Sequence, residues 1–202
     1  MYRGILTTFI AIYLSIWNIV CYDSSTKHAT APHINVLEYG ESVFMEVIEP
    51  EDISYLYKLR PAKNFGSDFT KQHYGVALVP GEPYHGCSPL TNIDLILNSV
   101  ALIQRGGCSF VTKTFNAEQA GAIAIIITDQ DEENDSGSVD MIQDGTERDV
   151  TIPALYLLGK DGYMIKKTIE RYHLPHAVIN IPINITSIPL HQRHNRPPWV
   201  LW

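Results

Sequence analysis

A strand–helix–strand pattern in the middle of the chain limits its possible folds more than any other feature. The apolar segment Val100–Ile103 ends at the pair Gly106-Gly107, and Ser109 is a good N-cap for a helix over 110–120. The run Ala122–Ile127 that follows is apolar throughout, which is typical of a strand covered on both faces. This order predicts a βαβ unit whose two strands are parallel.

Further strand-like segments lie on both sides of this unit. They are short, apolar or alternating runs between proline and glycine breaks, namely Ser42–Val47, Ile53–Leu59, Tyr74–Val79, Ile152–Leu158 and Ala177–Ile183. Gly159–Gly162 predicts a turn before a helix over 163–172, and Pro182 predicts an edge position for the last strand. The sequence therefore predicts an α+β protein that is rich in β-structure.

The first residues have the pattern of a signal peptide. Arg3 precedes the apolar run Gly4–Cys21, and the polar segment Asp23–Lys27 follows it. We expect residues 1–21 to be a cleaved signal peptide; the alternative is an uncleaved anchor, since the run is nearly long enough to span a bilayer. No second long apolar run occurs, so we expect a secreted protein that is free of the membrane after cleavage.

The cysteines and two sequons fit the secretory pathway. Cys21 would leave with the signal peptide, which leaves Cys87 and Cys108 as a pair that an oxidising compartment favours as a disulfide. Asn134 and Asn184 each begin an N-x-S/T sequence without proline and are the predicted glycosylation sites. Because a glycan cannot be buried, we expect both asparagines at the surface.

The stretch Arg105–Phe110, RGGCSF, allows three interpretations. A phosphate-binding loop would need a lysine and a hydroxyl after its last glycine, where Cys108 and Ser109 stand instead. A nucleophilic cysteine at a helix N-terminus would have a lowered pKa, but it would need a free thiol and a base. A tight structural turn joined to Cys87 is the interpretation that we favour. The net charge of −7 without a basic patch argues against nucleic acid as a partner.

The acidic segment 129–149 offers weaker candidates. Its first residues alternate carboxylates like a calcium loop, but Asn134 occupies the position where an EF-hand loop needs glycine. Asp140 and Asp144 could form a catalytic pair, although no base or cleft motif accompanies them. We therefore predict no metal site, no cofactor and no catalytic residue, with an unrecognised hydrolase as the less favoured alternative.

Taken together, these motifs resemble the protease-associated (PA) domain. The residues that carry the resemblance are Val100–Phe110, Lys113, Ala117, Ala120–Ala122, Ile125–Ile126, Ile152–Ala154 and Asp161–Gly162. The resemblance covers about residues 74–175 and implies an open barrel or sandwich of six to seven strands with flanking helices. It also implies a module that binds proteins or covers another domain and has no catalytic apparatus of its own.

The domain boundaries follow from that resemblance. We expect a signal peptide (1–21), an N-terminal extension whose strands pack on the core (22–73), the PA domain (74–175), and a final strand with an aromatic tail (176–202). Pro197-Pro198-Trp199 and Trp202 in the tail also resemble a small secreted member of the family.

Trp199 and Trp202 predict either docking on the protein's own sheet or a partner-binding surface. The predicted function is that of a secreted, N-glycosylated, non-catalytic module for an unidentified protein or peptide. A lumenal trafficking protein that binds cargo is the alternative.

Overall fold

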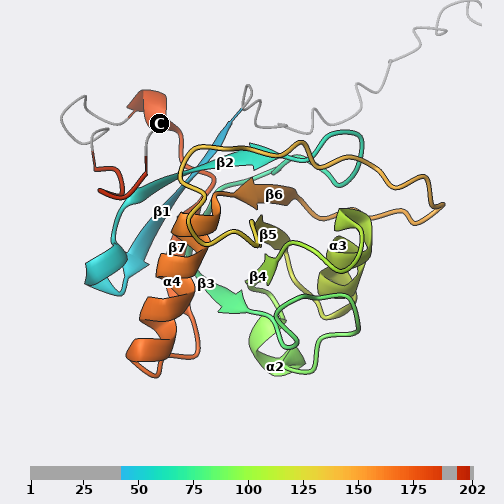
Figure 1. Cartoon of the computed structure of the whole chain (residues 1–202), viewed down its shortest axis with the longest axis horizontal. Helices are drawn as coiled ribbons and strands as arrows, with labels where there is room; N and C mark the ends of the chain where they lie inside the picture. Colours follow the sequence, from blue (N-terminus) through green and yellow to red (C-terminus); the bar gives the residue numbers. More distant parts are fainter. Residues whose placement is uncertain (1–41, 188–194, 201–202) are drawn as a thin grey trace, which may run out of the picture. The chain divides into compact units, whose positions relative to one another are not determined.

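Seven strands close into a barrel in the computed structural model, which describes residues 42–187 and 195–200 (Figure 1). Neighbours around the barrel follow the order β1-β2-β6-β5-β4-β3-β7. The strands are β1 (Val43–Glu49), β2 (Leu56–Pro61), β3 (His73–Pro80), β4 (Val100–Gln104), β5 (Ala124–Thr128), β6 (Ala154–Leu157) and β7 (Ala177–Ile181). The predicted β-rich fold class and strand number are confirmed, but the barrel is closed, where an open barrel or sandwich was expected. The predicted signal peptide lies outside the described residues.

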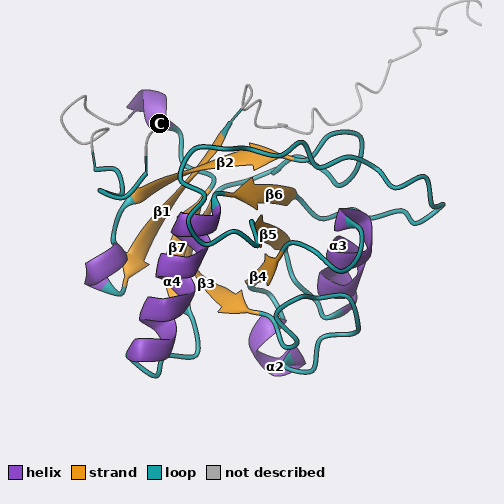
Figure 2. Ribbon diagram, viewed as in Figure 1, coloured by secondary structure: helices purple, strands orange, loops and turns teal. Residues whose placement is uncertain are grey.

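The predicted βαβ unit is present as β4, a helix and β5. The helical elements are η1 (Glu51–Ile53), α2 (Ile93–Ile96), α3 (Phe110–Gln119), α4 (Gly159–Arg171) and η2 (Ile185–Ser187), of which the α-helices are labelled in Figure 2. The strands β4 and β5 pair in parallel with Val100 opposite Ala124. The hydroxyl of Ser109 accepts a hydrogen bond from the backbone N–H of Thr112, so Ser109 is the N-cap of α3, as predicted.

In the parallel half of the barrel, the strands β4, β5 and β6 are buried on both faces. The strands β3, β4, β5 and β6 pair in parallel, and β1, β2 and β7 complete the barrel through antiparallel pairs. Val100 and Leu102 of β4 join a cluster to which all seven strands and α4 contribute. Ala101 and Ile103 join a second cluster with residues of α2 and α3. This burial explains the continuous apolar runs in the sequence.

The strand predicted over Ile53–Leu59 begins three residues late. The residues after Pro50 form the single turn η1, in which the N–H of Ile53 donates to the carbonyl of Pro50 at 3.2 Å. The alternation of apolar residues therefore spans a turn and a strand, and β2 starts only at Leu56. The short helix α2 was not predicted, because four residues give no helical periodicity.

Two predictions near the C-terminal half are also wrong. Gly159–Gly162 is the first turn of α4 and not a separate turn. The strand β7 is not at an edge, because it pairs with both β1 and β3. Pro182 lies one residue beyond β7, so its missing N–H interrupts no hydrogen bond of the strand.

Candidate functional site

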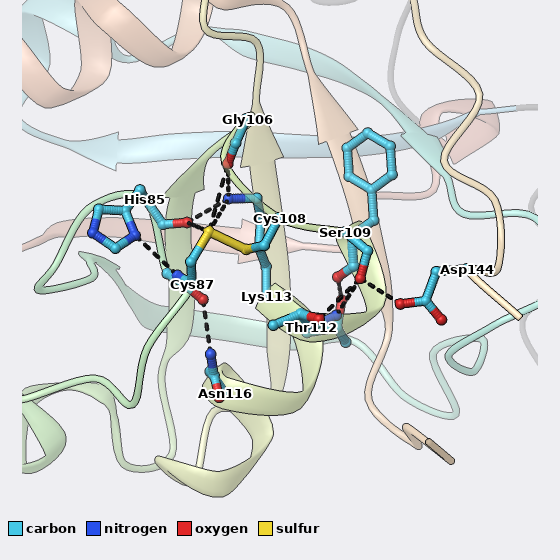
Figure 3. Close-up of a disulfide and its surroundings, with 12 residues drawn as sticks. His85, Cys87, Gly106, Cys108, Ser109, Thr112, Lys113, Asn116 and Asp144 are labelled. Atoms are coloured by element: carbon cyan, nitrogen blue, oxygen red, sulfur yellow. Dashed lines mark hydrogen bonds between the residues drawn. A yellow bond between two sulfur atoms is a disulfide. The ribbon is translucent and has the colours of Figure 1, made fainter. Parts of the chain in front are cut away.

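The turn 105–110 is fixed by a disulfide between two loops. Cys108 in this turn is bonded to Cys87 in the loop between β3 and α2, with 5.7 Å between the Cα atoms (Figure 3), so the predicted pairing is confirmed. Gly106 and Gly107 have φ angles of 100° and 80°, which side chains disfavour. A Cβ atom at Gly107 would also lie 3.2 Å from the sulfur of Cys87. Both glycines are therefore required by the backbone conformation of the turn.

Lys113, in the first turn of α3, is a buried cation beside this disulfide. Its Nζ donates to the carbonyl oxygens of His85 and Gly106, the latter at 2.6 Å, and lies 3.5 Å from the sulfur of Cys87 (Figure 3). Within residues 42–187 and 195–200, no carboxylate forms an ion pair with it. Burial lowers the pKa of Lys113 to about 8. The sequence indicated Lys113 only as part of a family pattern, because its burial depends on the loop that carries Cys87.

Asn134 belongs to a polar cluster at the carboxyl ends of β5 and β6. Its Nδ2 donates to a carboxylate oxygen of Asp129 at 2.9 Å and to the carbonyl of Gly137 at 2.7 Å. The hydroxyl of Tyr156 donates to the same oxygen at 2.5 Å, and Arg105 forms an ion pair with it at 3.2 Å. Burial raises the pKa of Asp129, but these partners outweigh it and hold the pKa below its usual value. This predicted glycan acceptor is therefore a half-buried structural side chain.

The second sequon lies at the surface just after β7. Asn184 is exposed, as expected of a glycan acceptor. Its Oδ1 accepts hydrogen bonds from the backbone N–H of Thr186 at 3.0 Å and from the Thr186 hydroxyl at 2.6 Å. The two sequons thus differ in exposure and in how their side chains are used.

An open groove of about 420 Å³ lies where β2 and β6 meet. These strands pair through only two residues each, with Arg60 opposite Tyr156 and Pro61 opposite Leu155. The strands contribute the floor of the groove, and the segments 62–69 and 143–153 supply its walls. Gln143 lines the groove, and its buried Oε1 accepts no hydrogen bond from the described residues. No sequence motif indicated this groove, because its two walls are far apart in the chain.

Trp199 is half-buried and packs against the core. Its Nε1 donates to Oδ1 of the buried Asp161 at 2.9 Å, and its ring meets that of Tyr55 edge-on with 5.5 Å between centroids. The tail thus docks on the protein itself through Trp199, but on α4 and the segment before β2 and not on the sheet that was expected. Trp202 lies outside the described residues, so a partner-binding role for it stays a prediction.

The carboxylates considered for catalysis have other partners. Asp140 forms ion pairs with Arg60 at 2.5 Å and with Lys63 at 2.7 Å. Asp144 accepts a hydrogen bond from the N-cap Ser109 at 2.5 Å (Figure 3). In the part of the chain that the structure describes, no three His, Cys, Asp or Glu side chains are grouped as metal ligands would be. None of the helices described there has the length and apolar character needed to cross a membrane.

Comparisons with known proteins agree with the sequence motifs that resemble the PA domain. The PA domain family matches residues 75–165. A PRADC1-like protein of Drosophila melanogaster is 44% identical over 162 residues, which are 79% of this chain and 82% of that protein.

Other similar proteins are much longer. The human ER degradation-enhancing alpha-mannosidase-like protein 3 is 38% identical over 54% of this chain, but the match spans only 12% of that protein. A zinc aminopeptidase from Bacillus subtilis is 18% identical over 68% of this chain and 29% of its own chain, with a TM-score of 0.48.

Proposed function

The chain belongs to the PA-domain family, and we propose that it is a secreted, N-glycosylated, non-catalytic module that binds an extended peptide segment of another protein. The groove between β2 and β6 carries this proposal. A volume of about 420 Å³ is within the range of small-ligand sites and accommodates a few side chains of a peptide.

The lining of the groove suits a peptide. The half-buried Pro61 and Ala62 offer apolar surface, and Phe65, also half-buried, adds an aromatic side chain to one wall. The Oε1 of Gln143 is buried and accepts no hydrogen bond from the described residues, and a rotation of this side chain toward the groove would offer it to a backbone N–H of the peptide. An acceptor left without a partner is costly, so a donor from a bound peptide would be favourable there.

The secretory part of the proposal rests on independent features. The apolar run Gly4–Cys21 is typical of a signal peptide, and the disulfide between Cys87 and Cys108 needs an oxidising compartment. Asn184 is an exposed sequon. A lumenal cargo-binding role is the second candidate, since one similar protein is named as an ER degradation-enhancing mannosidase-like protein.

A displayed library of random linear peptides tests the groove. The purified, disulfide-bonded protein selects peptides, and their affinities are then measured for the wild type and for Gln143→Leu. We expect selected peptides to bind Gln143→Leu about tenfold more weakly, since one hydrogen bond to a buried acceptor is lost.

Gln119→Leu is the matched control, because Gln119 is exposed on α3 and does not line the groove. It should bind the same peptides as tightly as the wild type. The proposal is wrong if no peptide is selected, or if both variants bind the selected peptides like the wild type.

A further inference from the structure

The ammonium group of Lys113 links the two loops of the disulfide site through hydrogen bonds, but its positive charge exceeds what that structural role needs. A buried cation is costly unless it is paired. Here its three N–H donors face the carbonyls of His85 and Gly106 and the sulfur of Cys87, and no carboxylate is paired with it in the described residues. Figure 3 shows the amino group beside the sulfur of Cys87.

Opening of the disulfide would give this cation a counterion. A thiolate on Cys87 would lie next to the ammonium group, which is 3.5 Å from that sulfur in the disulfide form. The carbonyl oxygens of His85 and Gly106 are 3.6 Å from the same sulfur and would oppose a negative charge there. They are dipoles, however, while Lys113 carries a full charge at a similar distance.

The surroundings of the two sulfurs differ. Cys108 comes one residue before the N-cap of α3, where the helix dipole favours a thiolate, but Asp144 is bonded to the neighbouring Ser109 and opposes one. The other titratable group at the site is His85, whose Nδ1 accepts a hydrogen bond from the N–H of Cys87 at 3.0 Å. Cys87 is therefore the better leaving group, and both cysteines are only half-buried.

We propose that Cys87–Cys108 is an exchange-active disulfide that reacts with thiols, with Lys113 as the group that stabilises the leaving sulfur. The incoming thiolate attacks the sulfur of Cys108 and forms a mixed disulfide with it. The bond between Cys108 and Cys87 breaks, and its electron pair leaves on Cys87 as a thiolate beside Lys113. A second thiolate then attacks the incoming sulfur, which releases Cys108 as a thiolate and a disulfide of the two external thiols.

The first experiment titrates each reduced cysteine alone. Thiolate absorbance is followed against pH in Cys108→Ser and in Cys87→Ser. We expect the pKa of Cys87 to lie at least one unit below the usual value of about 8.5, and that of Cys108 to lie above that of Cys87. A pKa of Cys87 at or above about 8.5 would overturn the proposal, whatever the behaviour of other variants.

The second experiment uses the full oxidised protein and defined thiols. Its redox equilibrium with mixtures of reduced and oxidised glutathione is measured for the wild type and for Lys113→Met. We expect Lys113→Met to favour the disulfide by about tenfold, which is about 30 mV for a two-electron couple. Lys167→Met, on α4 and away from the disulfide, should match the wild type.

Rates distinguish the source of the thiol. The rate at which the native protein is reduced is measured with glutathione and with a protein dithiol of the thioredoxin type. The reductant with the higher rate constant per thiolate shows whether the disulfide reacts preferentially with a small thiol or with a protein thiol. Equal equilibria for the wild type and Lys113→Met, or reduction only on unfolding, would refute the exchange role.

Discussion

The side-chain amide of Asn134 has two hydrogens on its nitrogen, and the protein uses both. They bond to the carboxylate of Asp129 and to the carbonyl of Gly137, whereas an N-linked glycan would replace one of them. Loss of the bond to Asp129 removes a donor from a carboxylate that is only 5% exposed. The sequon at Asn134 is thus in conflict with the folded structure, and that at Asn184 is not.

We therefore predict a single glycan, on Asn184, when the protein is expressed in secreting animal cells. Mass spectrometry before and after enzymatic deglycosylation measures it. Asn184→Gln should remove the whole mass difference and Asn134→Gln should leave it unchanged. A glycopeptide that contains Asn134 in the folded, secreted protein would contradict this prediction.

Asn134→Ala should also lower the free energy of unfolding by about 1–3 kcal/mol, because Asp129 loses a hydrogen-bond partner.

The helix α4 packs closely against the end of β5 at Gly162. It lies in the first turn of α4, and a Cβ atom there would clash with the side chain of Thr128 at the end of β5. Thr128 is itself fixed, since its hydroxyl donates to the carbonyl of Leu158 at 3.2 Å. The glycine therefore permits close contact between helix and strand.

Gly162→Ala consequently tests which of two effects is larger. Alanine favours an α-helix over glycine by about 1 kcal/mol, while overpacking of a close contact costs about 1–3 kcal/mol. Because Thr128 is fixed, we predict that overpacking is the larger effect and that the variant is less stable than the wild type by up to about 2 kcal/mol in urea unfolding. Lys167→Ala on the same helix should change little. A more stable Gly162→Ala would show that the contact relaxes.

Local patterns predicted the elements where the signal was long and uninterrupted. The segment from β4 to β5 contains a helix N-cap, a glycine turn and two apolar runs, so its sequence was sufficient to predict the βαβ unit. The prediction of a turn at Gly159–Gly162 was wrong, because glycine occurs both in turns and at close packing contacts. Only the position of Thr128 in the folded chain distinguishes the two. Closure of the barrel could not be predicted, since β7 pairs with β1 across most of the chain, and the hydrogen-bonded Glu46 and Asn180 are 134 residues apart.

The candidate site was predictable only in part, for a related reason. Counting cysteines was enough to pair Cys87 with Cys108. The groove and the burial of Lys113 arise from loops that meet only in the folded chain. The conflict at Asn134 likewise depends on Asp129 being buried at the end of β5. Spacing in the sequence contains none of this information.

At the scale of the whole molecule, Asp161 joins the tail to the barrel. One carboxylate oxygen accepts the hydrogen bond from Trp199, while the other is buried without a hydrogen-bond partner in the described residues. Burial raises the pKa of Asp161 to about 7, although the bond from Trp199 acts in the opposite direction. The folded protein therefore holds this proton far more tightly than the unfolded chain, in which an aspartate has a pKa of about 3.9.

Stability should consequently fall as the pH rises from about 4 to about 7. The contribution of the protonated Asp161 is complete below about pH 4 and is lost as the pH rises through about 7. Between pH 5 and pH 8 we predict a loss of about 2–3 kcal/mol in the free energy of unfolding, measured by urea denaturation. Asp161→Asn keeps an acceptor for Trp199 but has no proton to lose, so this part of the pH dependence should vanish. Asp94→Asn, at an exposed position of α2, should retain it. If Asp161→Asn lost as much stability as the wild type over this range, another group would have to be responsible, and the buried carboxyl would be ionised at neutral pH.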